Sequence, residues 1–284
     1  MRIGLSTNGL RGHTLERAIS LAAGLGLEAV EFSASREFED LGVPGIFPWE
    51  RDRIGGLKPL LAGFRHIGIL APYSGLDFFS RNPRVRQLAV DHVLSTIDLA
   101  KALGAQQVTL RLNTGRQDLP EERRARETTS LLQEFAAHAG ERQVRLAVEN
   151  ADYFYPLPRL LKAIQDLNLA TVGIALDIPA VFLSRTEPYY LPYGGAAEFI
   201  RQAGPALFSV QLHDFDGRSA NLPLGRGKIR FEPIVAALCD LEFKQPVIIE
   251  STFKGPEEVL DSLAYLRREI DHGRSARLQR GAGS

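Results

Sequence analysis

The sequence predicts a single domain folded as a closed (β/α)8 barrel, the TIM-barrel class, and two observations support this prediction. Short apolar runs rich in Val, Ile and Leu alternate eight times with longer amphipathic segments along the 284 residues, as expected for buried parallel strands joined by crossover helices. No linker interrupts the alternation, and such barrels commonly have about 250 residues. We expect residues 1–271 to form the barrel. Residues 272–284 lack apolar periodicity and should form a flexible basic C-terminal tail.

The expected strands are short apolar runs, and each of the last four ends at an acidic residue or a histidine. They are residues 2–6, 29–33, 65–70, 107–112, 144–149, 172–177, 208–213 and 247–250. Several of the helices that follow them begin at capping residues such as Thr14 or Asn82, and the first ends before Gly26. The helices should cover about residues 14–25, 49–63, 83–103, 120–140, 158–167, 195–203, 232–241 and 256–270.

The charge balance gives no sign of a polyanionic partner. Lys plus Arg and Asp plus Glu each count 34, which gives a formal net charge of zero, so nucleic-acid binding would have to be argued from a local site. We expect no nucleic acid, and the resemblance described below implies a small-molecule substrate. No segment has about 18 apolar residues in a row, so no membrane association is expected. The one cysteine, Cys239, cannot form an internal disulfide. This is typical of a reducing compartment and predicts a cytoplasmic protein.

Four side chains suited to metal binding close the last four expected strands: Glu149, Asp177, His213 and Glu250. The loops that follow the strands form the active face of such a barrel, so these side chains should meet there. Any one of them could instead cap a helix or lie in a solvated loop, but four at equivalent places favour a shared site. Three carboxylates and one imidazole suit one divalent ion, such as Mn²⁺, Zn²⁺, Co²⁺ or Fe²⁺.

The stretches that carry these residues resemble those of a known family. They read Ala-Val-Glu149-Asn150, Ala-Leu-Asp177-Ile-Pro, Val-Gln-Leu-His213-Asp214, Pro-Leu-Gly225-Arg-Gly227 and Val-Ile-Ile-Glu250-Ser. In order and context they are similar to the xylose-isomerase-like barrels, which unite AP endonucleases with ketose 3-epimerases, inosose dehydratases and hydroxypyruvate isomerases. The resemblance covers essentially the whole chain. It implies the fold but does not select a substrate, because one fold hosts many activities.

The epimerase branch of this family suggests a mechanism. There, the matching residues bind one Mn²⁺ or similar ion, and the two glutamates also transfer protons on opposite faces of the substrate. The resemblance therefore implies Glu149 and Glu250 as catalytic groups of an isomerase or epimerase that works through a stabilised enediolate on a sugar, sugar phosphate or inositol-type compound. His213 would ligate as neutral imidazole, and its other nitrogen needs an acceptor such as Asp214, which could equally cap the strand end.

The chain also departs from the family pattern. Many relatives have a histidine three residues after the aspartate, where this chain has Ala180. The endonuclease branch has further histidines where Leu70, Asn113 and Asn221 align here, and those residues build a three-metal cluster. Without them at most one metal site remains, which argues against cleavage of abasic DNA.

Further residues near the expected rim are candidates for substrate contact. Arg111 and Arg218 could bind a carboxylate or phosphate, which would make the substrate anionic, or they could be ordinary solvated charges. Tyr73 and Trp49 could line the pocket. Glu31 could be a rim acid or a supporting residue, and we expect the glycines of Gly-Arg-Gly to shape a tight turn rather than to cradle a phosphate.

Two alternative functions stay open at this stage. One is a single-metal lyase of the inosose-dehydratase kind, or a phosphodiesterase, on the same scaffold. The other is a catalytically silent sugar-binding barrel. Exchange of solvent deuterium into a substrate carbon would distinguish an isomerase from a hydrolase or a binding protein.

Overall fold

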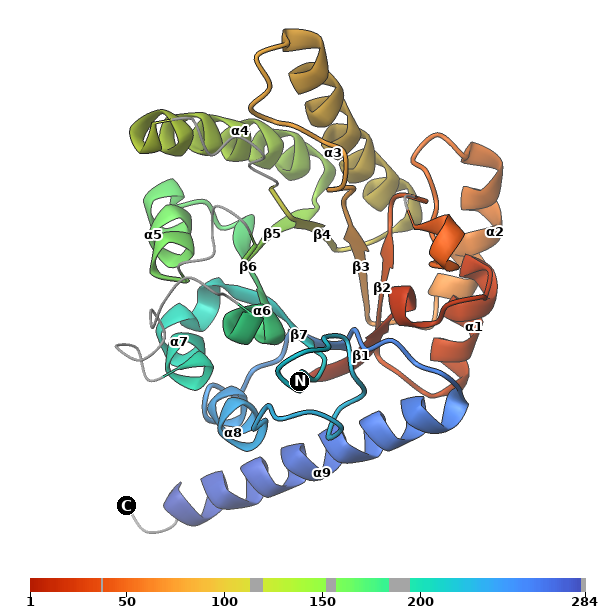
Figure 1. Cartoon of the computed structure of the whole chain (residues 1–284), viewed down its shortest axis with the longest axis vertical. Helices are drawn as coiled ribbons and strands as arrows, with labels where there is room; N and C mark the ends of the chain where they lie inside the picture. The colour runs from red at the N-terminus through yellow and green to blue at the C-terminus, as the bar shows by residue number, and fades with distance from the viewer. Residues whose placement is uncertain (37, 113–119, 152–156, 184–194, 282–284) are drawn as a thin grey trace.

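The computed structural model describes residues 1–36, 38–112, 120–151, 157–183 and 195–281. Within these ranges, eight parallel strands close into a barrel in the order of the sequence (Figure 1). They are β1 (Arg2–Ser6), β2 (Ala29–Ser33), β3 (His66–Leu70), β4 (Gln107–Leu110), β5 (Arg145–Glu149), β6 (Val172–Asp177), β7 (Leu207–Leu212) and β8 (Pro246–Ile249). Strand β1 closes the barrel on β8, where Arg2 pairs with Pro246 and Leu5 with Ile249. The predicted (β/α)8 barrel is confirmed.

The strands form where the apolar runs predicted them. Every residue of β2, β3, β4, β6, β7 and β8 is buried, as expected for parallel strands covered on both faces. The largest difference from the expected bounds is at the end of β4, which stops at Leu110 instead of Leu112.

The helices surround the barrel (Figure 1). They are α1 (Leu15–Gly24), α2 (Arg51–Leu61), α3 (Pro83–Leu103), α4 (Glu121–Arg142), α5 (Leu157–Leu167), α6 (Ile178–Leu183), α7 (Ala196–Ala203), α8 (Glu232–Asp240) and α9 (Pro256–Gly281). Thr14 caps α1 by accepting from the Arg17 amide at 3.2 Å. The sequence pattern did not predict α6, a short helix that begins directly after β6. Within the described parts of the chain, no helix is both long and apolar enough to span a membrane.

The last helix corrects one prediction. We expected a flexible tail from residue 272, but α9 continues to Gly281, because this segment has partners on α8. Gly273 permits close packing, since a Cβ there would lie only 3.0 Å from Cys239 Sγ. Further along, Arg280 Nη2 lies 2.5 Å from Asp240 Oδ1. A sequence that lacks an apolar stripe can still form a helix where tertiary contacts support it.

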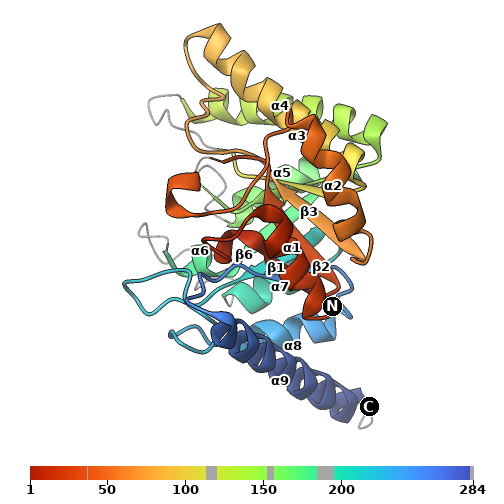
Figure 2. The ribbon, with the colours of Figure 1, turned by 90° about the vertical axis from the view of Figure 1, so that its right-hand side faces the viewer.

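The strand ends bring the candidate residues to one face. In the register of the sheet, Glu149 pairs with Ala175 and Asp177 with Gln211, so the last residues of β5 to β7 lie at neighbouring heights. Figure 2 shows the long segment between β7 and α8 projecting on the left, the side to which the strands lead. This face is where active sites of such barrels lie.

Candidate active site

The four predicted metal ligands lie at the same end of the barrel. Glu149 and Asp177 are the last residues of β5 and β6, and His213 and Glu250 directly follow β7 and β8. Glu149, Asp177 and His213 are 1%, 7% and 4% exposed, and Glu250 is partly exposed to a cavity that it lines. The strand pattern alone therefore identified a real cluster of ionisable side chains.

Burial shifts the protonation of this cluster. Loss of hydration raises the pKa of Asp177 to about 7, and the negative charge of Glu149 adds to the rise. Burial likewise raises the pKa of Glu250 well above its ordinary value, assisted by the charge of Glu31. Neighbouring carboxylates that cannot all ionise in a dry site are typical of functional centres.

His213 is neutral and held in one tautomer. Burial lowers its pKa to about 4. Its Nδ1 accepts a hydrogen bond from the Asn221 amide at 2.9 Å, so the ring proton sits on Nε2, 3.6 Å from Asp177 Oδ1. Ligation through Nε2 would require the other tautomer, in which Nδ1 donates to the Asp214 carbonyl oxygen, now 3.5 Å away.

The sequence suggested that the Asp214 carboxylate could accept a hydrogen bond from the His213 ring. In the structure this carboxylate has other partners. It accepts four backbone N–H groups of the segment after β7: those of Phe215, Gly225, Gly227 and Ile229, at 2.8, 3.0, 2.8 and 3.1 Å. A Cβ on Gly227 would lie 2.2 Å from Asp214 Oδ1. The Gly-Arg-Gly stretch therefore shapes this segment, as predicted, and Asp214 fixes it in place.

Arg111 lies inside the cluster, although the sequence placed it only near the rim. It follows β4, and its Nη2 forms a salt bridge with Glu149 Oε1. Its Cζ lies 4.5 Å from the centre of the Tyr73 ring. Burial opposes the charged form of Arg111, but the charge of Glu149 outweighs this effect and raises the pKa of the guanidinium. The structure thus brings two predicted substrate contacts, Arg111 and Tyr73, to the carboxylates.

Glu31 lies inside the barrel beneath this cluster and supports it. Its Oε1 accepts from Gln211 Nε2 at 3.1 Å and its Oε2 from Thr109 Oγ1 at 3.0 Å. Burial raises the pKa of this carboxyl group. With both oxygens satisfied and only 1% of the residue exposed, Glu31 is not a rim acid.

A small cavity of about 190 Å³ opens beside Glu250. Its lining comes from the loops after β1, β2, β3, β7 and β8: Asn8, Arg11, Phe38, Leu41, Val43, Tyr73, Asn221, Glu250 and Thr252. Sequence reasoning missed Asn8 and Arg11. Asn8 Nδ2 donates to Glu250 Oε1 at 3.4 Å and its Oδ1 accepts from Ser33 Oγ at 2.9 Å. Their position directly after β1, on the active face, is the feature that could have identified them.

Two predicted substrate contacts are not brought to this cavity. Trp49 is 57% exposed, stacks on Phe47, and lines a separate depression beside α2 and α3. Its ring also contacts His92 of the neighbouring helix α3, with ring centroids 5.5 Å apart, and loop aromatics often pack on a helix in this way. Arg218 is exposed at the tip of the segment after β7, where its amide donates to Asp216 Oδ1 at 2.8 Å. Asn113, one of the aligned positions of the endonuclease branch, lies outside the described residues.

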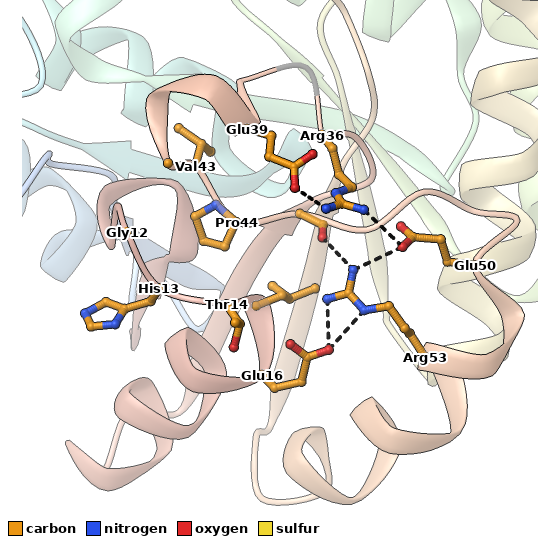
Figure 3. Close-up of a pocket in the computed structure, with 13 residues that line it drawn as sticks. Gly12, His13, Thr14, Glu16, Arg36, Glu39, Val43, Pro44, Glu50 and Arg53 are labelled. Atoms are coloured by element: carbon orange, nitrogen blue, oxygen red, sulfur yellow. Dashed lines mark hydrogen bonds and ion pairs between the residues drawn. The ribbon is translucent and has the colours of Figure 1, made fainter.

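The larger cavity of about 570 Å³ holds a different kind of charge cluster (Figure 3). Arg36 pairs with Glu39 and Glu50, and Arg53 pairs with Glu16 and Glu50. Figure 3 shows the ion pairs between these side chains as dashed lines. Each of these charged side chains therefore has at least one oppositely charged partner.

The residues at the barrel mouth fit a divalent cation by their chemistry. Glu149 Oε2 is buried without a hydrogen-bond partner, and carboxylate oxygens and imidazole are suitable ligands for Mn²⁺, Zn²⁺, Co²⁺ or Fe²⁺. As the side chains now lie, no three His, Cys, Asp or Glu residues in the described ranges converge closely enough to coordinate an ion. Side-chain rotation at Glu149, away from Arg111, and a change of tautomer at His213 would be required.

Fold and site together define a (β/α)8 barrel with a cluster of buried ionisable side chains at the ends of its last four strands. A family model described as xylose isomerase-like TIM barrel matches residues 19–269. The chain belongs to this family, as its resemblance predicted. It has no significant match among curated protein sequences.

Solved structures share the fold at low sequence identity. A D-tagatose 3-epimerase-like protein is 21% identical, with a TM-score of 0.76 and coverage of 97% of this chain and 99% of that one. An L-ribulose 3-epimerase is 20% identical, with a TM-score of 0.74 and coverage of 99% and 97%. The IolI protein with a bound zinc atom is 17% identical, with a TM-score of 0.70 and coverage of 97% and 99%.

Proposed function

We propose that this protein is a metal-dependent isomerase or epimerase of a sugar or a related hydroxy-carbonyl compound. The observation that carries the proposal is the meeting of Glu149, Asp177, His213 and Glu250 at the barrel mouth, three of them almost fully buried. Membership of the xylose isomerase-like family and the sugar epimerases among its structural neighbours support it.

The four side chains would hold one divalent ion. The zinc atom of the IolI neighbour supports a divalent cation of this kind. When bound, the ion supplies Lewis-acid stabilisation of negative charge that develops on substrate oxygens. His213→Ala should weaken ion binding by roughly tenfold or more, because it removes a ligand. Absence of a stoichiometric divalent ion from the reconstituted wild-type protein would contradict the proposal.

Glu149 and Glu250 would move the protons. Glu149 ends β5 and Glu250 directly follows β8, so the substrate can lie between them. Removal of a carbon-bound proton on one side with return on the other inverts the centre or moves the carbonyl group. Asn8 holds Glu250 through its 3.4 Å hydrogen bond.

The cavity beside Glu250 supports a small substrate, because its volume of about 190 Å³ suits a small polyol. Arg11 lines it and has no ion-pair partner within the described ranges, so this cation is available for a carboxylate or phosphate group of the substrate.

A cytoplasmic location of the protein stays a prediction.

The deciding experiment is proton exchange in D₂O. Purified protein with Mn²⁺ or Co²⁺ is incubated with ketohexoses, ketopentoses and their phosphates, and deuterium at substrate carbon is followed by NMR. We expect deuterium to enter one carbon and a new sugar to appear, and Glu250→Gln to abolish both. Ion-dependent hydrolysis or dehydration without exchange would favour the single-metal lyase or hydrolase instead.

A further inference from the structure

The guanidinium of Arg111 lies among the carboxylates that the proposed function assigns to an ion. Its salt bridge to Glu149 is shielded from water, since 23% of the Arg111 side chain and 1% of the Glu149 side chain are exposed. On its other side, the group lies 4.5 Å from the Tyr73 ring centre. Arg111 is therefore clamped between the carboxylate and an aromatic ring.

This one positive charge lies within a cluster of buried acidic side chains. Its salt-bridge partner Glu149 and the neighbouring strand-end residue Asp177 are 1% and 7% exposed. In the arrangement described, Arg111 supplies the countercharge that a divalent ion would otherwise provide.

The salt bridge is nevertheless incomplete. Glu149 Oε2 and Arg111 Nε are both buried and without a hydrogen-bond partner. An unsatisfied buried polar atom costs free energy, so a permanent structural pair would be expected to bond both atoms. This pair instead leaves a carboxylate oxygen for an incoming cation and a guanidinium nitrogen for an incoming acceptor.

We propose that Arg111 is a resident counter-cation, which a divalent ion must displace from Glu149 before it can bind. The inference rests on the proposed function, because it takes Glu149 as a ligand. A guanidinium and a divalent ion on the same buried carboxylate repel each other strongly. The released guanidinium keeps its contact with Tyr73, which borders the cavity beside Glu250. There its five N–H donors can bind substrate oxygens, so the ion binds first and prepares the substrate contact.

The test is the affinity of the metal-free protein for Mn²⁺, measured by calorimetric titration at neutral pH. Arg111→Gln removes the charge and should bind Mn²⁺ roughly tenfold or more tightly than the wild type. Arg111→Lys keeps the charge and should stay within about threefold of the wild type. Arg226→Gln is the matched control: it removes the same charge from a residue that pairs with Asp261 at 3.2 Å on the exposed surface. It should change the affinity by less than about twofold.

A second measurement guards against loss of folding. Thermal unfolding with and without Mn²⁺ should show a larger ion-induced rise in Tm for Arg111→Gln than for the wild type, because the metal-free variant has lost its countercharge. If Arg111→Gln is folded and binds Mn²⁺ no more tightly than the wild type, the inference is overturned and the proposed function survives. A tenfold gain for Arg111→Lys would also overturn it. If no variant binds Mn²⁺, the proposed function and the inference both fail.

Discussion

Two clusters of arginines and glutamates near the loops that follow the strands differ in what they leave unsatisfied. In the outer network of Figure 3, two arginines meet three glutamates whose side chains are 20% to 58% exposed. At the barrel mouth, Arg111 pairs with the buried Glu149, and Glu149 Oε2 and Arg111 Nε are buried without a hydrogen-bond partner. The outer cavity is about 570 Å³ and the inner one about 190 Å³. Unbalanced buried charge, not cavity size, therefore identifies the candidate site.

The largest expected effect is on turnover at the barrel mouth. Glu149→Gln and Glu250→Gln should each lower kcat by on the order of a thousandfold, because an amide can ligate an ion but cannot accept a proton. Ion binding should partly survive and is measured in the same preparations. Turnover near the wild-type rate in either variant would assign the proton transfer to another group.

The next prediction tests whether the buried negative charge of Asp177 lowers the stability of the folded protein. Because the pKa of Asp177 rises from 3.8 to about 7 on folding, the folded protein keeps a proton that the unfolded chain releases between these pH values. This contribution to stability is fully present below pH 3.8 and is lost as pH rises through about 7. Asp177→Asn should therefore stabilise the metal-free protein by a few kcal/mol above that pH and by little in acid.

Urea unfolding of wild type and Asp177→Asn across this pH range measures the difference. The pairwise comparison is needed because His213 acts in the opposite direction: its pKa falls from 6.5 to about 4, so its contribution grows as pH rises between these values. Both proteins contain His213, so the part of its effect that does not depend on the nearby Asp177 carboxylate cancels. A stability difference that does not change with pH would show that Asp177 is not a buried, strained charge.

A smaller effect is expected where charge is fully satisfied. Asp214→Asn replaces an acceptor of four N–H groups with a side chain that has one acceptor oxygen, so it should lower the free energy of unfolding by about 2–3 kcal/mol. It should also raise KM more than it changes kcat, since the segment carrying Asn221 loosens. Chemical denaturation and steady-state kinetics check both expectations. Unaltered stability would mean that the segment holds its shape without Asp214.

The smallest effect belongs to the outer network. Arg53→Gln breaks contacts with Glu16 at 2.8 Å and Glu50 at 3.3 Å, but exposed pairs contribute little, so stability should fall by less than about 1 kcal/mol. Ion affinity and turnover should not change. A loss of turnover comparable to that of Glu250→Gln would break the distinction between the two clusters.

The sequence predicted the barrel and the four ionisable residues because both depend on local patterns. A buried parallel strand is an apolar run, and a charge at its end marks the active face. Glu149 and Asp177 end their strands, and His213 and Glu250 follow theirs by one residue, so small errors in strand bounds did not affect the prediction.

The remaining features depend on contacts between distant residues. The salt bridge of Arg111 and Glu149 joins residues 38 apart in sequence and depends on side-chain rotamers. The prediction that Trp49 lines the pocket failed for a similar reason. The sequence does not show whether a loop residue faces the cavity or a neighbouring helix. The helical state of residues 272–281 depends on packing against α8, which apolar periodicity does not reveal.

The hydrogen bonds between Asp214 and the segment after β7 affect how substrate and product reach the site. The segment after β7 has four of its amides fixed by one carboxylate, so we expect it to form a rigid wall that does not open between turnovers. Phe38, Leu41 and Val43 from the loop after β2 also line the cavity, so we expect substrate and product to exchange past them. Leu41, 52% exposed, lies at that entrance. Its size would set how fast product leaves without altering the chemistry beneath it.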